Sequence, residues 1–303
     1  MSIHQNTANS AVSAKTGSFA QSLTAIVLGL FVVGFVGFGS RMWKPFTMPP
    51  MTPVMPMPSP AIEGNVMSSF RNIVFTAVLV GILGGLAVSA MQAFGTTPLI
   101  LQAETYEGAG GEAAHSHEAT APGAVAPAHE HNEEAWAPAD GFERTAYTVA
   151  ANVLTAIGYA LVLTGLISLR GTNGGWREGL LWGVAGFAAV MLAPMIGLPP
   201  ELPGSPAAAL EARQIWWLAT VAATAGGIAL IAFRREPWSI VLALVLIVAP
   251  HVVGAPLPPE GEHALAPLPL ERQFIVAATV TSFVFWALLG TLSTFFLKRF
   301  QSA

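Results

Sequence analysis

The sequence predicts an all-α integral membrane protein of about seven transmembrane helices, one N-terminal span followed by a six-helix bundle. Hydrophobic residues make up 53% of the 303 residues, only 10% are charged, and the mean hydropathy is +0.59. So little polar surface cannot cover a soluble globule. The chain also contains repeated apolar runs long enough to cross a hydrocarbon core of about 30 Å, which takes about 20 helical residues.

Seven apolar runs are the expected spans, and none of them contains Asp, Glu, Lys or Arg. Such charged side chains are costly inside a bilayer, so their absence supports the assignment. In chain order the expected spans are residues 21–39, 72–94, 145–169, 179–198, 215–233, 238–255 and 274–297. Small residues in "GILGGLAVSA", "GVAGFAA" and "ATAGG" predict close packing between the helices.

Basic residues fall in alternate connections between these spans. They are Arg41, Lys44, Arg71, Arg170, Arg177, Arg234, Arg235, Lys298 and Arg299. Short cytoplasmic loops are enriched in Lys and Arg, so these connections and the C-terminus are expected to face the cytoplasm. We therefore expect a multi-pass protein of the bacterial inner membrane whose remaining connections lie on the outer side.

The first outer connection, residues 97–143, is predicted to be a flexible, acidic loop. It contains eight Glu, one Asp and no Lys or Arg, and it is rich in Ala, Gly and Pro. Two His-x-His pairs, His115/His117 and His129/His131, lie in this loop. Both rings of such a pair can turn to one ion, and imidazole with carboxylate support binds cobalt, nickel, copper and zinc. The loop is expected to capture a divalent metal ion; the alternative is a solvated acidic loop with incidental histidines.

His251 is the only ionisable side chain other than tyrosine within an apolar run. An ionisable residue at membrane depth marks a pathway or site by default. Pro250 and Gly254 interrupt helical hydrogen bonding beside it, and carbonyls freed at a broken span often bind cations in transporters. Residues on the same outer side that are expected to complete a coordination shell are Glu201, Glu260 and His263. The alternative is a histidine that is hydrogen-bonded inside the bundle.

Several functional classes have no support in the sequence. The chain has no P-loop pattern for ATP hydrolysis, no chain of buried carboxylates for proton relay, and no nucleophile paired with a base. Cysteine is absent, so thiolate metal sites are excluded. We therefore expect no enzymatic activity, no prosthetic group and no nucleic-acid partner. A divalent cation entering along the membrane potential gains roughly 4.6 kcal/mol per 100 mV, which suffices for uptake without another energy source.

From Met67 onward the chain resembles the CbtA family of proposed cobalt transporter subunits. The resemblance rests on "MSSFRNIVFTAVLVGILGG", "LILQAETYE", "EAWAPADGFERT", "GLPPELPG", "RQIWW" and "APHVVGAP". It implies a membrane permease component for Co²⁺ uptake, linked to cobalamin synthesis and working with a small one-span partner, CbtB. By position, the resemblance points to Glu104, the histidines of the first loop, Glu201 and His251.

Residues 1–66 are expected to form a separate N-terminal part, with residues 67–303 as the CbtA-like domain. The N-terminal part has one apolar span and then "MPPMTPVMPMPSP", whose prolines forbid helix and indicate an extended linker. A one-span partner of CbtB type usually ends in a histidine-bearing tail, but no histidine lies between His4 and His115. A diverged fused partner and an unrelated extension are therefore both open.

Together these features predict a permease component that captures a divalent transition metal ion, Co²⁺ being favoured, and transfers it inward along the membrane potential. Two alternatives are a metal-capturing or sensory membrane protein without transport, and a structural subunit of another membrane complex. The expected partners are the metal ion, the lipid bilayer and a CbtB-like subunit, and the oligomeric state is open.

Overall fold

The computed structural model describes residues 60–115, 138–171, 175–234 and 236–302, and every element within these ranges is helical. The elements are α2 (Pro60–Phe94), α3 (Thr96–His115), α4 (Phe142–Arg170), α5 (Trp176–Phe187), the π-helix η1 (Ala188–Leu192), α6 (Ala193–Met195), α7 (Leu210–Phe233), α8 (Pro237–Val253) and α9 (Leu268–Gln301). The expected first span, residues 21–39, lies outside the described residues.

The helices confirm the prediction of an all-α membrane protein. Five are long and apolar enough to cross a membrane, and α5, η1 and α6 together make one of these. A sixth apolar helix, α8, has 17 residues and is shorter. At about 1.5 Å per residue, α8 is about 25 Å long, slightly less than a typical hydrocarbon core. These six segments correspond to the six spans expected between residues 72 and 297.

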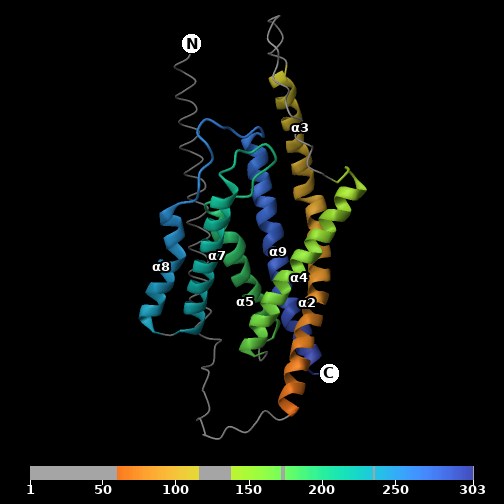
Figure 1. The fold of residues 1–303 in the computed structure, drawn as a ribbon, viewed down its shortest axis with the longest axis vertical. Helices are drawn as coiled ribbons and strands as arrows, with labels where there is room; N and C mark the ends of the chain where they lie inside the picture. Colours follow the sequence, from red (N-terminus) through yellow and green to blue (C-terminus); the bar gives the residue numbers. More distant parts are fainter. Residues whose placement is uncertain (1–59, 116–137, 172–174, 235, 303) are drawn as a thin grey trace, which may run out of the picture.

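The spans alternate in direction, which brings three connections to one end of the bundle (Figure 1). These are the segment that contains α3, the connection 196–209 and the connection 254–267. We call this end the loop end and the opposite one the C-terminal end, since the C-terminus lies there. The helix termini that carry Arg170, Arg234 and Lys298 also lie at the C-terminal end, in agreement with the expected alternation.

Glycines allow the closest contacts between spans. A Cβ at Gly81 of α2 would lie 2.4 Å from the Ile157 side chain of α4, and a Cβ at Gly85 would lie 2.5 Å from the Val153 Cα. The same applies to α5 and α9, where a Cβ at Gly183 would lie 2.2 Å from the Trp286 carbonyl oxygen. In a bilayer, helices associate through such close packing because lipid and side chains are equally apolar.

Helix α3 departs from the expectation for the first connection. The sequence predicts a flexible loop from residue 97, whereas the structure has a helix over Thr96–His115, so that part of the prediction is wrong. The run "LILQAETYE" consists largely of residues with good helix propensity. It also has an apolar face: Ala103 is fully buried and packs in one cluster with Leu270 and Phe274 of α9.

Candidate metal site at the loop end

The three loop-end segments pack against one another. The Leu265 amide of the connection 254–267 donates a 3.2 Å hydrogen bond to the Gly204 carbonyl of the connection 196–209. Gly204 has a φ of 74°, and a Cβ there would lie 3.0 Å from the Glu107 side chain of α3. Leu202 is buried in the same cluster as Ala103 of α3. We refer to α3 and these two connections together as the cap.

Glu104, a predicted ligand on α3, is bound by Arg144 at the start of α4. The guanidinium donates two hydrogen bonds, from Nη2 to Glu104 Oε1 and, at 3.1 Å, from Nη1 to Glu104 Oε2. Nη1 also lies 3.3 Å from Asp140 Oδ1. The hydrogen bonds from Arg144 are the main cause that lowers the pKa of the Glu104 carboxyl. Partial burial raises this pKa, and the positive charge of Arg144 lowers it further. Glu104 is therefore ionised at neutral pH and paired.

Glu201 is paired in a similar way. Arg213 Nη2, from the first turn of α7, lies 2.8 Å from Glu201 Oε2, and both side chains are about 30% exposed. Glu201 also lines a cavity of about 190 Å³ between the connection 196–209 and α9. Glu271, in the first turn of α9, lines the same cavity. Two carboxylates from different segments therefore border one small space at the loop end.

His251 lies in the last turn of α8, against Trp216 of α7. The two rings are edge-to-face, with centroids 6.0 Å apart and an interplanar angle of 70°. The Trp216 indole Nε1 donates a 3.2 Å hydrogen bond to the Pro250 carbonyl, which fixes the indole beside the histidine. His251 Nε2 is buried and has no hydrogen-bond partner in the described part of the chain. A neutral imidazole with a free nitrogen is a competent ligand for a transition metal.

Gly197 makes room for this arrangement. A Cβ at Gly197 would lie 2.6 Å from the Trp216 ring and 2.8 Å from Ala255 Cβ. The connection 196–209 and the C-terminal end of α8 therefore approach each other across the Trp216 indole. This contact lies at the same end of the bundle as the two ion pairs (Figure 1).

The predicted ligands that the structure describes lie in segments at one end of the bundle, but they do not form a closed coordination shell. Within the described ranges, no group of three or more His, Asp or Glu side chains is close enough together to hold a metal ion. Glu260 and His263 are exposed in the connection 254–267. His115 is the last residue of α3, and the other loop histidines, His117, His129 and His131, lie outside the described residues. The predicted shell stays a prediction.

The partners of these ligands are not evident from the sequence alone. Arg144 and Arg213 are basic residues on the loop side of their spans, against the general distribution of Lys and Arg in this chain. That exception was a usable indication, because a basic residue in an acidic connection needs a reason. Glu271 and Trp216 lie at the starts of spans, where acidic and aromatic residues are common, so their positions indicated nothing specific.

Comparison with protein families gives one match. The family model described as "Probable cobalt transporter subunit (CbtA)" matches residues 70–298. This range contains all six apolar helices apart from the terminal residues of α2 and α9, and the match confirms the resemblance noted from the sequence motifs. No curated protein and no solved structure matches the chain.

Proposed function

Because this chain belongs to the CbtA family of probable cobalt transporter subunits, we propose that it is a permease component for uptake of a divalent transition metal ion, Co²⁺. The chain is a multi-pass membrane protein with several apolar helices. The proposed function is transport, with no catalytic step. The observation that carries the proposal is the gathering of the candidate ligands Glu104, Glu201 and His251 at one end of the bundle, in or beside the packed cap.

We propose that the loop end faces the outside of the inner membrane. The nine Lys and Arg residues of the alternate connections would then face the cytoplasm, as the positive-inside tendency favours. With this orientation, the acidic segment and its histidine pairs would belong to the side from which the metal ions enter. The C-terminus of α9 would be cytoplasmic.

Transfer would start with capture by the loop histidines and acidic groups, which raise the local cation concentration. The free Nε2 of His251 would then replace water on the ion, because imidazole is a better ligand than water for these metals. Glu104 and Glu201 are each paired with an arginine, Arg144 and Arg213 respectively. A divalent ion that approaches the cap competes with each guanidinium for the carboxylate oxygens.

The membrane potential would supply the driving force. Two charges moving inward gain roughly 4.6 kcal/mol per 100 mV, which corresponds to more than about a thousandfold accumulation. The description of the family as a subunit favours a further component, and a one-span CbtB-like protein is the expected partner. Cobalamin synthesis is the expected use of the cobalt.

The test is uptake of Co²⁺ by vesicles that contain the purified chain and carry an imposed potential, inside negative. We expect His251→Ala to lower uptake at subsaturating Co²⁺ by at least about tenfold, since loss of a group that supports a metal site typically costs 10- to 100-fold in affinity. The matched control is Val252→Ala, because Val252 is the next residue of α8 and is 78% exposed. We expect this variant to retain uptake.

Two results would contradict the proposal. Binding of Co²⁺ without potential-driven uptake would favour a capture protein, and equal uptake by the His251→Ala and Val252→Ala variants would remove His251 from the pathway. If uptake needs a separate subunit, co-reconstitution with that subunit should restore it in the parent chain but not in the His251→Ala variant.

A further inference from the structure

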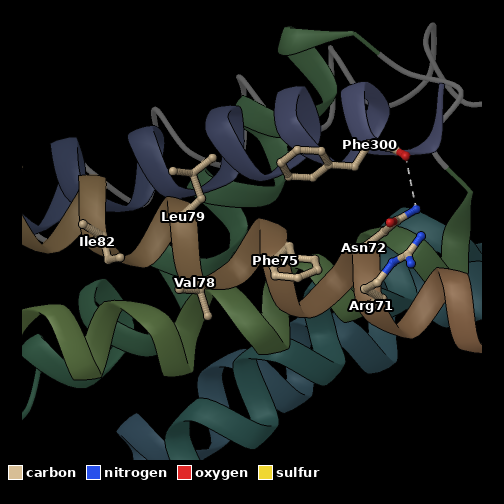
Figure 2. Close-up of a pocket in the computed structure, with 7 residues that line it drawn as sticks. All are labelled: Arg71, Asn72, Phe75, Val78, Leu79, Ile82 and Phe300. Atoms are coloured by element: carbon tan, nitrogen blue, oxygen red, sulfur yellow. Dashed lines mark hydrogen bonds between the residues drawn. The ribbon is translucent and has the colours of Figure 1, made fainter. Parts of the chain in front are cut away.

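A groove lies between α2 and α9 near the C-terminal end of the bundle, away from the candidate metal site. It encloses about 590 Å³. Figure 2 shows that its lining comes mainly from α2, with Phe300 contributed by α9. The lining residues are Arg71, Asn72, Phe75, Val78, Leu79, Ile82 and Phe300.

Two contacts between α2 and α9 bound the groove. At one end, Asn72 Nδ2 donates a 3.2 Å hydrogen bond to the Phe300 carbonyl (Figure 2). At the other, Gly84 brings α2 against Leu289, where an added Cβ would lie only 2.9 Å from a methyl group. Asn72 and Gly84 are twelve positions apart on α2, about 18 Å of helix. The apolar wall between them is therefore held in place at both ends.

The side chains of this wall remain uncovered by the six described spans. Phe75 is 60% exposed and Ile82 is 40% exposed, although their neighbours Ala77 and Val80 are fully buried. These side chains line a hollow surface. A hollow apolar surface is better filled by a helix with matching side chains than by mobile acyl chains, because packing drives helix association in membranes.

The chain itself contains an apolar segment of the right length. Residues 21–39, "QSLTAIVLGLFVVGFVGFG", have no charged residue and form the expected span that lies outside the described part of the chain. Gly34 and Gly37 are three residues apart, so in a helix they share one face and allow close approach to a neighbour. The phenylalanines between and beside them provide bulk for a groove.

The position of this segment in the sequence brings it to the groove. Arg41 and Lys44 follow it directly, and Arg71 precedes the apolar part of α2, so both segments have a basic terminus that favours the same side of the membrane. Residues 40–59 join the segment to α2, which begins at Pro60. Twenty residues span up to about 66 Å when extended, which is enough to connect the end of this segment to the first residue of α2.

We propose that residues 21–39 form a transmembrane helix that packs antiparallel to α2 in the groove between α2 and α9. The N-terminal part of the chain is then an integral seventh helix of the bundle, and its position beside Asn72 and Phe300 covers the exposed wall. This proposal depends on no metal ion, so its test is independent of transport.

The absence of cysteine makes disulfide cross-linking a direct test. Leu79→Cys in the groove is combined with a single cysteine at each position from 30 to 37 in turn, and a protease site is inserted in the connection 46–58. Leu244→Cys on α8 is the matched control, because Leu244 is 45% exposed. Leu79 and Leu244 each lie eight positions beyond the charged residue before their apolar run, Arg71 and Glu236 respectively. Oxidation is followed by cleavage and electrophoresis without reductant.

We expect Leu79→Cys to hold the two fragments together at positions that recur every three or four residues, and Leu244→Cys to hold them at none. Equal linkage to both helices, or no linkage to Leu79→Cys at any position, would overturn the proposal. A disulfide that joins two chains and doubles the mass would assign the groove to a second copy and would also overturn it.

A second measurement uses the cleaved chain without cysteines. We expect the N-terminal fragment to co-purify with the remainder in mild detergent. Val78→Trp places an indole in the groove and should release the fragment, whereas Val245→Trp on the exposed side of α8 should not. Retention that is unchanged by Val78→Trp, or release from the unsubstituted chain, would contradict the proposed packing.

Discussion

The Trp216 indole contacts the His251 ring and donates a hydrogen bond to the Pro250 carbonyl. Gly197 lies against this indole, so the absence of a side chain at Gly197 is important for the arrangement. A side chain at Gly197 would lie 2.6 Å from the Trp216 ring, so Gly197→Ala must displace the indole or the connection. Overpacking of this kind typically costs about 1–3 kcal/mol. We expect Gly197→Ala to lower the thermal unfolding midpoint and to weaken Co²⁺ binding, measured by differential scanning fluorimetry and isothermal titration calorimetry.

The control for this prediction is Gly158→Ala in α4, where an added Cβ has nothing within 4 Å. Alanine has a better helix propensity than glycine by up to about 1 kcal/mol, so this variant should be as stable as the parent chain or more stable. If Gly197→Ala behaved in the same way as Gly158→Ala, the close contact between Gly197 and Trp216 would have no energetic importance.

The ion pair between Glu104 and Arg144 makes stability depend on pH in a defined direction. The pKa of the Glu104 carboxyl is lowered from the ordinary value of 4.5, chiefly by the hydrogen bond from Arg144. A carboxyl with a lowered pKa in the folded state stabilises that state above the unfolded pKa, and the contribution is lost as the pH falls through the folded pKa. We therefore expect Glu104→Gln to destabilise the chain at pH 7, and the difference to shrink below about pH 4.5.

The measurement is the unfolding midpoint in detergent from pH 7 to pH 3 for the parent and the Glu104→Gln chains. Glu107→Gln is the control, because Glu107 lies on the same helix and forms no ion pair with any described residue. A Glu104→Gln effect that stayed constant down to pH 3 would show that the substitution acts through packing, not through the charge.

At the scale of single residues, the sequence allowed prediction of the candidate ligands but not of their partners. Glu104 and Arg144 are 40 positions apart, and Trp216 and Pro250 are 34 apart. No local spacing connects such residues, because the pairs are created by the way α3, α4, α7 and α8 pack. His251 could be predicted, since one ionisable group in an apolar run is conspicuous in composition alone.

At the scale of elements, hydropathy predicted the five described helices that are long enough to cross a membrane and the shorter helix α8, because each is an almost wholly apolar run. It did not predict α3, whose composition is mixed and whose Ala103 packs against α9. The π-helix η1 was also not predicted; it precedes Pro194, which has no N–H to donate within the helix. Local exceptions of this kind depend on tertiary contacts that composition does not encode.

The packing of α3 on the bundle can be tested by removing one of the buried side chains that contact it. Leu202 is 4% exposed and shares a cluster with Ala103 of α3 and Leu270 of α9. Leu202→Ala removes a buried side chain, which typically costs about 2–5 kcal/mol. We expect faster amide hydrogen exchange in α3 and in the connection 196–209, measured by mass spectrometry.

Leu257→Ala is the matched control, because Leu257 lies in the neighbouring connection 254–267 and is 85% exposed. It should leave exchange in α3 unchanged. Equal exchange in the two variants would mean that α3 does not depend on the cluster for its position, and the cap would then not be a single packed unit.

At the scale of the whole molecule, the distribution of charge predicted which connections share an end, and the bundle agrees (Figure 1). Composition could not predict how closely those connections approach. The hydrogen bond between Leu265 and Gly204, and the packing of Leu202 on α3, turn separate connections into a cap. The candidate ligands on this cap therefore depend on the assembled bundle for their spacing.

The last prediction separates the proposed role of the loop histidines, which is capture of the ion, from that of His251, which is its transfer. If the histidines only gather ions, replacing all four, His115, His117, His129 and His131, by Ala lowers the local metal concentration but leaves the later transfer step intact. We expect Co²⁺ uptake by reconstituted vesicles to fall severalfold at low metal concentration and to recover at saturation, whereas His251→Ala should reduce uptake at both. The same loss at low and saturating Co²⁺ in the fourfold variant would contradict a gathering role, because a higher Co²⁺ concentration would then fail to compensate for the missing histidines.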